Sequence, residues 1–554
     1  MSVTRLTTGI GSVSFANLQS PPRFVRDVEL RLNLLRSPVG RMPAEILEEI
    51  FMYWMILDPP CGRSHDVGWM KVMHVCRRWR TIAANYSLLW TTIAASSLPD
   101  IWATTMLSFS KNAPLTLSLH MDKHTRTLEK SLNENIMHAA RVQSPRVQHL
   151  RLEYGKSFRP FALVMNLVNR CLSSPLLESL TITGREPAIF STILKGALLP
   201  SLTSLRLHRC ITVWDAQLLS TLEFLQIDMV PAHHLRAYES YKRNFATLLS
   251  MLGSMSKLRT LILHNFFPMS AHAIELPPGL AELHVGGEGV DVMRFLSQLI
   301  IPRITRTRIF IEGEEPSSIS HLLAQFGGDA RPPRSLLVDL HDDAYAYYSL
   351  MLWDERKDFN SARADTAYFM LSIRKARRLP RRPESFYYGS LCDGLCFDEL
   401  TDVLFETSPD RVWAPIRWQE TFQDAAQVRG LYVRGLEAAQ SLIIALWKGG
   451  SLSGLYPDVI LFPALERFGL CDVELEHGTS FMRDGSVICV FEALCSALRR
   501  RQAHGMNLRQ LDVSAGYRRY ASWMDEVMKE YWASFTTNFT AYIEREEKSR
   551  SRIS

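Results

Sequence analysis

Hydrophobic residues recur from about residue 145 in a short pattern, Leu-x-x-Leu-x-Leu, in which valine or isoleucine replaces some leucines. The pattern occurs at 147–152, 177–182, 202–207, 222–227, 258–263 and 280–285. Its second and third apolar positions are two residues apart, so they point to the same side of the chain, which predicts one buried face of a short strand. Prolines at positions 145, 175, 200 and 278 precede four of these segments and end whatever lies before them.

The spacing of this pattern resembles that of leucine-rich repeats. Consecutive middle leucines, from Leu150 to Leu283, are 20 to 36 residues apart, and leucine-rich repeats have a period of about 20–29 residues. Helical spacing at 161–171 and 245–252 predicts an outer helical layer, and stacking such units buries a continuous core. The asparagine ladder of regular repeats is largely missing, so we expect an irregular array. A series of unrelated parallel strands is the alternative.

The repeat signal weakens between about 300 and 440. Residues 308–311 and 336–340 still predict strands there, and 465–470 and 508–513 restore the pattern. A final helix is expected over about 518–548. Its apolar stripe, which would cap the last repeat, consists of residues four apart: Trp523, Val527, Tyr531, Phe535 and Phe539.

A helical periodicity marks residues 38–90 instead. Met42-Pro43 begins a helix, and Pro59, Pro60 and Gly62 follow its end. Its apolar positions form one broad stripe: Ile46, Leu47, Ile50, Phe51 and Trp54. A second helix is expected over about 69–84, with Arg77, Arg78 and Arg80 left in water, and Leu88-Leu89-Trp90 makes a third piece. So small a unit gains stability from a partner or a following domain.

Three motifs in this segment resemble the F-box in order and spacing. They read Met42-Pro43-Ala44-Glu45-Ile46-Leu47-Glu48-Glu49-Ile50-Phe51, His74-Val75-Cys76-Arg77-Arg78-Trp79-Arg80 and Leu88-Leu89-Trp90. Met42 stands where the family has Leu, and residues 57–67 make a longer loop than compact members have, as in many fungal F-box proteins. A generic helical hairpin is the alternative, because short patterns recur by chance.

The resemblance implies a receptor subunit of a cullin-type ubiquitin ligase that is not itself an enzyme. An F-box binds a Skp-type adaptor, which joins it to a cullin scaffold, and the repeat region would hold a target protein. A scaffold acting outside a ligase is the close alternative, and a nucleic-acid-binding repeat protein is a remote one. Seven residues are expected to divide between the F-box core and the adaptor surface, with Leu47 and Ile50 at the interface: Pro43, Ile46, Leu47, Ile50, Val75, Trp79 and Trp90.

Two of the predicted strands indicate where a target would bind. Within 202–207 and 258–263 the apolar pattern positions are leucine, while Thr203, Ser204, Arg206, Arg259 and Thr260 between them are polar. The residues on or just beyond these strands are therefore expected near a target-binding surface, and their basic and amide groups suit an acidic or phosphorylated partner. They are Arg206, His208, Arg209, His264 and Asn265. A solvated strand edge is the alternative.

Composition and charge add few constraints. The 554 residues are 47% hydrophobic and 22% charged, which is typical of a globular protein with two to four domains. The net charge of +6 is too diffuse to imply nucleic-acid binding. One dense basic cluster is a candidate nuclear import signal or anionic-partner site, with a solvated surface as the alternative: Arg374, Lys375, Arg377, Arg378, Arg381 and Arg382.

No motif predicts a catalytic, metal or cofactor site. Gly155-Lys156-Ser157 lacks the leading glycine of a phosphate-binding loop, and Cys392 and Cys396 have no second pair at zinc spacing. The odd count of 9 cysteines has no disulfide rhythm, and neither a signal peptide nor a membrane span is evident. We therefore expect a protein of the cytoplasm, the nucleus or both.

Together these patterns predict a mainly α N-terminal F-box of three short helices, followed by an α/β leucine-rich-repeat-like solenoid. We expect an N-terminal extension at 1–37, the F-box at 38–92, joining elements at 93–144, the solenoid at 145–515, and a capping helix with a charged tail at 516–554.

Overall fold

The computed structural model forms two compact units, the first comprising residues 1–119 and 128–139 and the second residues 120–127 and 140–554. The structure describes residues 37–60, 67–94, 100–121, 142–154, 170–190, 201–212, 214, 220–230, 246–265, 267, 273–312, 319–327, 332–342, 346–357, 366–374, 392, 394–407, 413–448, 460–471, 479–481, 487–514 and 536–542.

The first unit is mainly helical. Its elements are η1 (Val39–Arg41), α2 (Ala44–Leu57), η2 (Gly68–Lys71), α3 (Val72–Val75), α4 (Arg77–Asn85), η3 (Ser87–Trp90), β1 (Thr92–Ala94), α5 (Asp100–Phe109) and β2 (Leu115–Met121). Helix α2 packs against η2, α4 and η3, and β1 pairs in parallel with β2, with Ile93 opposite Leu117.

The single helix predicted over 69–84 is wrong, because the chain breaks at Cys76. This residue has extended backbone angles (φ −158°, ψ 169°), so α3 ends before it and α4 begins after it. Its Sγ accepts a hydrogen bond from the backbone N–H of Trp79 at 3.4 Å and thereby caps α4. The helical period therefore identified the right apolar residues but missed a local change of direction.

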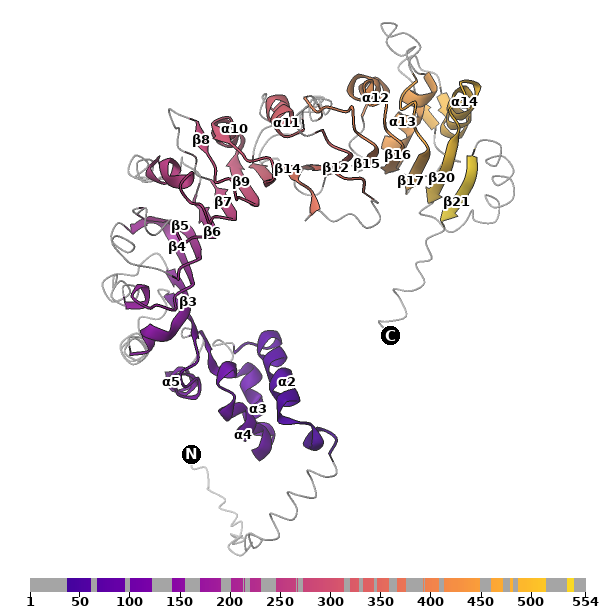
Figure 1. Ribbon diagram of the computed structural model, residues 1–554. Coiled ribbons are helices and arrows are strands. Elements are labelled where there is room, and N and C mark those ends of the chain that lie inside the picture. Colours follow the sequence, from indigo (N-terminus) through magenta and orange to yellow (C-terminus); the bar gives the residue numbers. More distant parts are fainter. Residues whose placement is uncertain are drawn as a thin grey trace, which may run out of the picture. The chain divides into compact units, whose positions relative to one another are not determined.

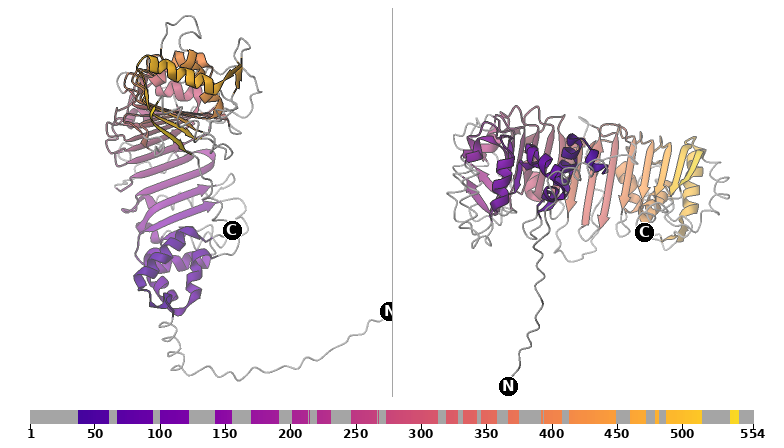
Figure 2. Two further views of the ribbon diagram at one scale, coloured as in Figure 1. Left: turned by 90° about the vertical axis from the view of Figure 1, so that its right-hand side faces the viewer. Right: turned by 90° about the horizontal axis from the view of Figure 1, so that it is seen from below.

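The second unit is built on a large, mostly parallel sheet (Figures 1 and 2). In the order in which they pair, its strands are β3 (Val147–Tyr154), β4 (Ser179–Phe190), β5 (Ser204–Thr212), β6 (Phe224–Asp228), β7 (Thr260–His264), β9 (Glu282–Glu288), β11 (Arg306–Glu312), β14 (Phe369–Arg374), β13 (Ala346–Trp353), β12 (Ser335–Asp342), β15 (Asp402–Thr407), β16 (Gly430–Arg434), β17 (Arg467–Cys471), β20 (Leu508–Ser514) and β21 (Thr536–Tyr542). Two small sheets accompany it, β8 (Ile274–Glu275) with β10 (Leu299–Ile300) and β18 (Thr479–Phe481) with β19 (Val487–Cys489).

Strand register confirms the strands expected from the leucine pattern. The middle residues of the six predicted segments lie opposite one another on neighbouring strands and are at most 1% exposed: Leu150, Leu180, Leu205, Leu225, Leu261 and Leu283. Their alternate neighbours are partly exposed. The leucines therefore line the face that the helices cover, and the other face, called the open face below, carries the polar residues.

Helices lie along the covered face of this sheet (Figure 1), among them α10 (Gly289–Leu296), α11 (Ile319–Gly327), α12 (Pro415–Phe422), α13 (Leu436–Lys448) and α14 (Val490–Ala503). Helix α13 packs on β15 and β16 as well as on α12 and α14, and its middle residues 441–446 are buried. Residues 246–252 are helical, as the sequence predicted. Of the other predicted outer helix, residues 161–169 lie outside the described residues.

The region in which the repeat signal weakens contains an antiparallel insertion. Strand β13 runs antiparallel to β12 and β14, so β14 rather than β12 pairs with β11, and β12 then pairs in parallel with β15. A simple succession of one strand per repeat is therefore interrupted here. At the C-terminus, the helix predicted over about 518–548 is wrong for residues 536–542, which form β21 and pair in parallel with β20.

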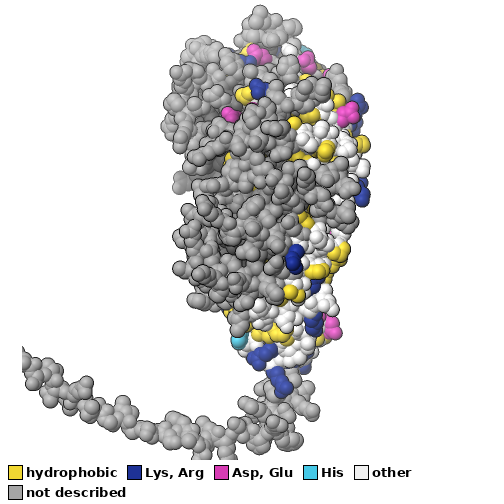
Figure 3. Space-filling model, turned by 90° about the vertical axis from the view of Figure 1, so that its left-hand side faces the viewer, with side chains coloured by type: hydrophobic (Ala, Val, Ile, Leu, Met, Phe, Trp, Pro, Cys, Tyr) yellow, Lys and Arg dark blue, Asp and Glu magenta, His cyan; other side chains and the backbone are white. Residues whose placement is uncertain are grey.

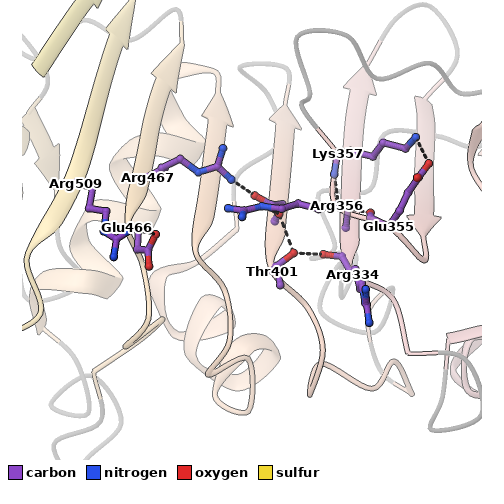
Figure 4. Close-up of polar contacts among 10 residues, drawn as sticks. Arg334, Glu355, Arg356, Lys357, Thr401, Glu466, Arg467 and Arg509 are labelled. Atoms are coloured by element: carbon purple, nitrogen blue, oxygen red, sulfur yellow. Dashed lines mark hydrogen bonds and ion pairs between the residues drawn. The ribbon is translucent and has the colours of Figure 1, made fainter. Parts of the chain in front are cut away.

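A buried carboxylate ties this insertion to the parallel strands beyond it. Asp402 of β15 is 0% exposed; its Oδ2 lies 3.0 Å from Nε of Arg356, just after β13, and its Oδ1 pairs with Arg467 of β17 (Figure 4). The hydroxyl of Thr401 also donates to it at 2.8 Å.

The glycine between the two ion-paired strands is required by this geometry. Gly430 of β16 lies in register between Asp402 and Arg467, and a Cβ there would lie 2.3 Å from the Asp402 carboxylate. Arg467 thus reaches the buried carboxylate across β16, the strand that separates β15 from β17, while Arg356 approaches it from the side of β12 and β13.

We expect Asp402→Ala to lower the free energy of unfolding of the second unit by about 1.5–3 kcal/mol, because it removes the buried acceptor of Arg356, whose side chain is half exposed, and of Arg467. The matched control is Glu466→Ala, which removes the more exposed pair with Arg509 and is expected to cost at most about 1 kcal/mol. Urea denaturation followed by tryptophan fluorescence measures both. Equal midpoints for the two variants would contradict the anchoring role of Asp402.

Candidate protein-docking surfaces

Helix α2 carries two apolar stripes that face in different directions. Leu47 and Phe51 are both 0% exposed and form the inner stripe. The outer stripe follows the helical spacing of four, three and four residues, with the exposed fraction of each side chain in parentheses: Ile46 (43%), Ile50 (38%), Tyr53 (69%) and Leu57 (82%). Because these residues lie on one side of the helix and stay in water, the unit leaves a continuous apolar surface without cover.

The inner stripe belongs to an aromatic core. The ring of Phe51 lies 5.1 Å from that of Trp79, and the ring of Trp90 lies 5.0 Å from Trp69 and 4.8 Å from Phe109. The indole N–H of Trp90 donates to the carbonyl of Ala83 at 2.6 Å, so its one polar group is satisfied inside the unit.

This core divides the seven residues that were expected to be shared between the F-box core and the adaptor surface. Leu47 and Trp90 are 0% exposed within the chain itself, so neither presents a side chain to a partner, and Leu47 is not an interface residue. Pro43 is exposed at the N-cap of α2, Ile46 and Ile50 belong to the outer stripe, Val75 is 55% exposed and Trp79 is half-buried. The sequence missed Tyr53 and Leu57, although both continue the spacing of Ile46 and Ile50.

A groove of about 680 Å³ lies between η1 and α4. Val39, Val75, Trp79 and Ile82 supply its apolar lining, and Arg77 and Arg78 are among its polar residues. Exposed hydrophobic side chains next to Lys and Arg side chains are visible at the lower end of Figure 3, in the first unit. A partner segment that enters this groove would meet apolar side chains flanked by positive charge.

Arginines that the sequence assigned to water hold this region together. The guanidinium of Arg78 donates to the backbone carbonyls of Val39, Gly40 and Met42, which fixes η1 against α4. Nε of Arg80 donates to the carbonyl of Met73 at 2.7 Å and links α4 to α3. The groove is therefore shaped by backbone contacts that no apolar pattern reveals.

The residues on either side of the long loop after α2 contact each other. The backbone N–H of Trp69 donates to the carbonyl of Asp58 at 2.8 Å, and Lys71 pairs with the Asp58 carboxylate at 3.4 Å. Gly68 between them has φ +55°, and a Cβ there would lie 2.5 Å from the same carbonyl. Because its two ends are joined, a longer loop leaves the packing of α2 against η2 intact.

In the second unit, three of the five predicted target residues lie on the open face. Arg206 and His208 of β5 and His264 of β7 are in register with Gln226 and Asp228 of the intervening β6. The guanidinium of Arg206 lies 4.5 Å from the ring centre of Phe224. Nδ1 of His208 lies 3.4 Å from the Asp228 carboxylate.

The other two predicted residues are placed differently. Arg209 and Asn265 have left-handed backbone angles, with φ of +55° and +63°. Asn265 follows β7 directly and donates its backbone N–H to the carbonyl of Gly286 at 2.7 Å. It therefore helps to end the strand, while Arg209 lies inside β5 where the register with β4 shifts.

Two imidazoles of the open face are partly withdrawn from water. Burial lowers the pKa of His264, although Asp228 and Glu312 oppose the shift. Burial, followed by the charge of the opposite Arg308, lowers the pKa of His284. Both rings are therefore neutral at physiological pH and can act there as uncharged hydrogen-bonding groups.

Some of the predicted sites lie outside the described residues. Of the basic cluster, Arg374 ends β14, whereas Lys375, Arg377, Arg378, Arg381 and Arg382 are not described. The segment Gly155-Lys156-Ser157 is not described either. Of the two cysteines weighed as zinc ligands, Cys392 is buried and Cys396 is partly buried. Within the described residues, no helix is both long and apolar enough to span a membrane.

Comparison with known protein families identifies the first unit. Residues 39–96 match the family model described as F-box-like, which supports the resemblance drawn from the three motifs. A comparison of the chain with curated proteins gives no match. The described surfaces thus combine an F-box-like domain, whose relatives generally bind Skp-type adaptors, with a large, mostly parallel sheet whose open face is mostly polar over β3–β7.

The two stripes of α2 predict opposite effects of truncation on stability. We expect Leu47→Ala to lower the free energy of unfolding of the first unit by about 2–5 kcal/mol, because it opens a cavity in the core. Ile50→Ala, at a 38% exposed position, is expected to change it by less than about 1 kcal/mol. Hydrogen exchange of the α2 backbone amides measures both, and equal losses would show that the outer stripe is also part of the core.

Proposed function

We propose that the chain is an F-box substrate receptor of a Skp–cullin–F-box ubiquitin ligase. The first unit binds the Skp-type adaptor through the outer stripe of α2, Val75 and the groove beside α4. The second unit, an irregular leucine-rich-repeat-like solenoid, holds the target protein. The chain itself has no catalytic role and needs no cofactor, and it works in the cytoplasm, the nucleus or both, which microscopy of the tagged chain would test.

One observation carries the proposal. In a domain that matches the F-box-like model, one helix buries Leu47 and Phe51 and leaves Ile46, Ile50, Tyr53 and Leu57 in water. Burial of apolar surface is favourable by about 25 cal/mol per Å². A small unit that leaves four large apolar side chains in water therefore forgoes this stabilisation. A partner that covers the stripe recovers that free energy.

The stacked strands support the receptor role of the second unit. Their leucine rows remain in register from β3 to β9, and the alternate residues of the same strands vary, mostly between basic, acidic, amide and hydroxyl side chains, with Phe224 and Ile262 as apolar members. An array of this kind keeps its core on one face and can vary the other face for recognition.

The mechanism that follows is proximity. An adaptor held by the first unit and a target held by the second are joined by one chain, so the target is presented to the conjugating machinery at a high effective concentration. Bond formation then belongs to other subunits. The same contacts without a cullin would make the chain a scaffold, and ubiquitination of a captured target in a reconstituted complex distinguishes the two.

We expect the double variant Ile46→Asp, Ile50→Asp to bind a recombinant Skp-type adaptor at least about tenfold more weakly than the unchanged chain, a loss of about 1.4 kcal/mol. The reason is that two carboxylates would be placed in an apolar interface. The matched control is Val290→Asp, which alters a 62% exposed apolar residue of the second unit and should leave adaptor affinity unchanged. Isothermal titration calorimetry measures all three affinities.

Thermal denaturation must show that each variant is folded. Unchanged adaptor affinity in the folded double variant would reject the outer stripe as the docking surface. No binding of the adaptor by the unchanged chain would reject the proposed function itself.

A further inference from the structure

Along the middle of the open face, the side chains change from mainly polar to apolar halfway along the sheet. One residue from each of ten neighbouring strands stands in register at this level, which we call the middle row: Arg206, Gln226, Ile262, His284, Arg308, Met370, Met351, Leu337, Leu404 and Tyr432. The first half of the row, on β5, β6, β7, β9 and β11, has an arginine at each end, Arg206 and Arg308. The second half, on β14, β13, β12, β15 and β16, is apolar.

The cations of the first half have no acidic partner among the described residues. Arg206 is exposed and Arg308 half-buried, and neither forms an ion pair there. The nearby carboxylates of Asp228 and Glu282 are instead approached by His208 at 3.4 Å and His284 at 4.0 Å. The two guanidinium groups are thus left with donors for an anionic group from outside the chain.

His284 adds a neutral group to this half. Its ring lies between Arg308 on β11 and Ile262 on β7, and its Nε2 forms no hydrogen bond within the described part of the chain. This Nε2 atom is itself buried, so the uncharged ring leaves the guanidinium of Arg308 as the polar group that faces a ligand at this point of the row.

The antiparallel insertion creates the apolar half. It places Met370, Met351 and Leu337 side by side on β14, β13 and β12, and Leu404 and Tyr432 continue the row on β15 and β16. Leu404 is 8% exposed and the other four are half-buried. Five strands span about 19 Å, and methionine side chains adapt to differently shaped apolar partners.

We propose that the middle row binds one extended segment of the target, in which anionic side chains lie next to bulky apolar ones. The anionic part lies over β5–β11 and the apolar part over β14–β16. Because Arg308 and Met370 are on neighbouring strands, about 4.8 Å apart, the last anionic and first apolar side chains of the segment are at most two residues apart. The inference rests on the proposed receptor function and names the class of target.

Charge complementarity decides between this occupant and others. A basic or purely apolar segment would leave Arg206 and Arg308 facing it without a counter-charge, which costs free energy on desolvation. A segment with carboxylates alone would leave the five apolar residues uncovered. The anionic group is either a run of glutamates or aspartates or a phosphorylated residue, since both give charge-assisted hydrogen bonds to arginine.

The test uses synthetic fluorescent peptides long enough to cross the row, about 13 residues when extended. One peptide carries a glutamate block followed by leucine and methionine, a second has phosphoserine in place of glutamate, and a third has the composition of the first in scrambled order. Fluorescence anisotropy with the full chain is expected to show at least about tenfold tighter binding of the first or second peptide than of the third. The comparison of the first two identifies the anionic group.

Substitutions within the middle row test whether the peptide binds there. Arg308→Glu is expected to weaken the ordered peptide at least about tenfold, and Met351→Ser at least about threefold. The matched controls are Arg294→Glu and Ile300→Ser, which alter an exposed arginine of α10 and a 53% exposed isoleucine of β10 and should change the affinity less than twofold. Adaptor affinity, measured on the same samples, should be unchanged by all four substitutions.

Two results would overturn the inference while leaving the proposed function in place. One is equal binding of ordered and scrambled peptides, or no peptide binding, by a chain that still binds the adaptor. The other is that Arg308→Glu abolishes binding of a single-stranded RNA while the peptides do not bind, since the open face would then be a nucleic-acid surface. Loss of adaptor binding in the unchanged chain rejects the proposed function instead.

Discussion

The second unit depends on one constraint, the alternation of side chains along each strand combined with in-register pairing between strands. Leu180, Leu205 and Leu225 are buried because each strand turns the same alternate residues to the helices. A shift of one residue in any strand would exchange these leucines for polar neighbours and expose them. Because the core is thus confined to one face, residues of the open face can differ from strand to strand without disturbing it.

The same constraint explains what the sequence predicts well and what it misses. Two alternating apolar positions predict the start of each strand from β3 to β9 within two residues, although β4 and β5 continue five to eight residues beyond the predicted ends. They do not predict that β14 rather than β12 pairs with β11, because that choice depends on contacts between distant segments, including the ion pairs of Asp402 with Arg356 and Arg467. The predicted C-terminal helix is wrong over residues 536–542 for a related reason. Residues four apart, such as Phe535 and Phe539, lie on the same side of either a helix or a strand, so their spacing does not distinguish the two.

In the first unit, the sequence identified the apolar residues of α2 but not which of them are buried in the core and which are exposed. Leu47 and Ile50 fall in one broad stripe on a helical projection, yet only the packing of η2, α4 and η3 around α2 determines which of the two is covered. Arg78 shows the same limit, because its three carbonyl partners on η1 and at Met42 lie more than thirty residues away in the chain. From the sequence, such an arginine is expected to be solvated, whereas in the structure its hydrogen bonds hold η1 against α4 and so shape the groove.

The account rests on the claim that the outer stripe of α2 is the docking surface of an F-box-like domain. Tyr53, 69% exposed in the middle of this stripe, allows the most direct measurement. A photo-crosslinking phenylalanine analogue placed at position 53 should form a covalent product with a bound Skp-type adaptor, whereas the same analogue at position 290, on the second unit, should not. Crosslinking from position 290 but not from position 53, with the adaptor bound, would contradict the account.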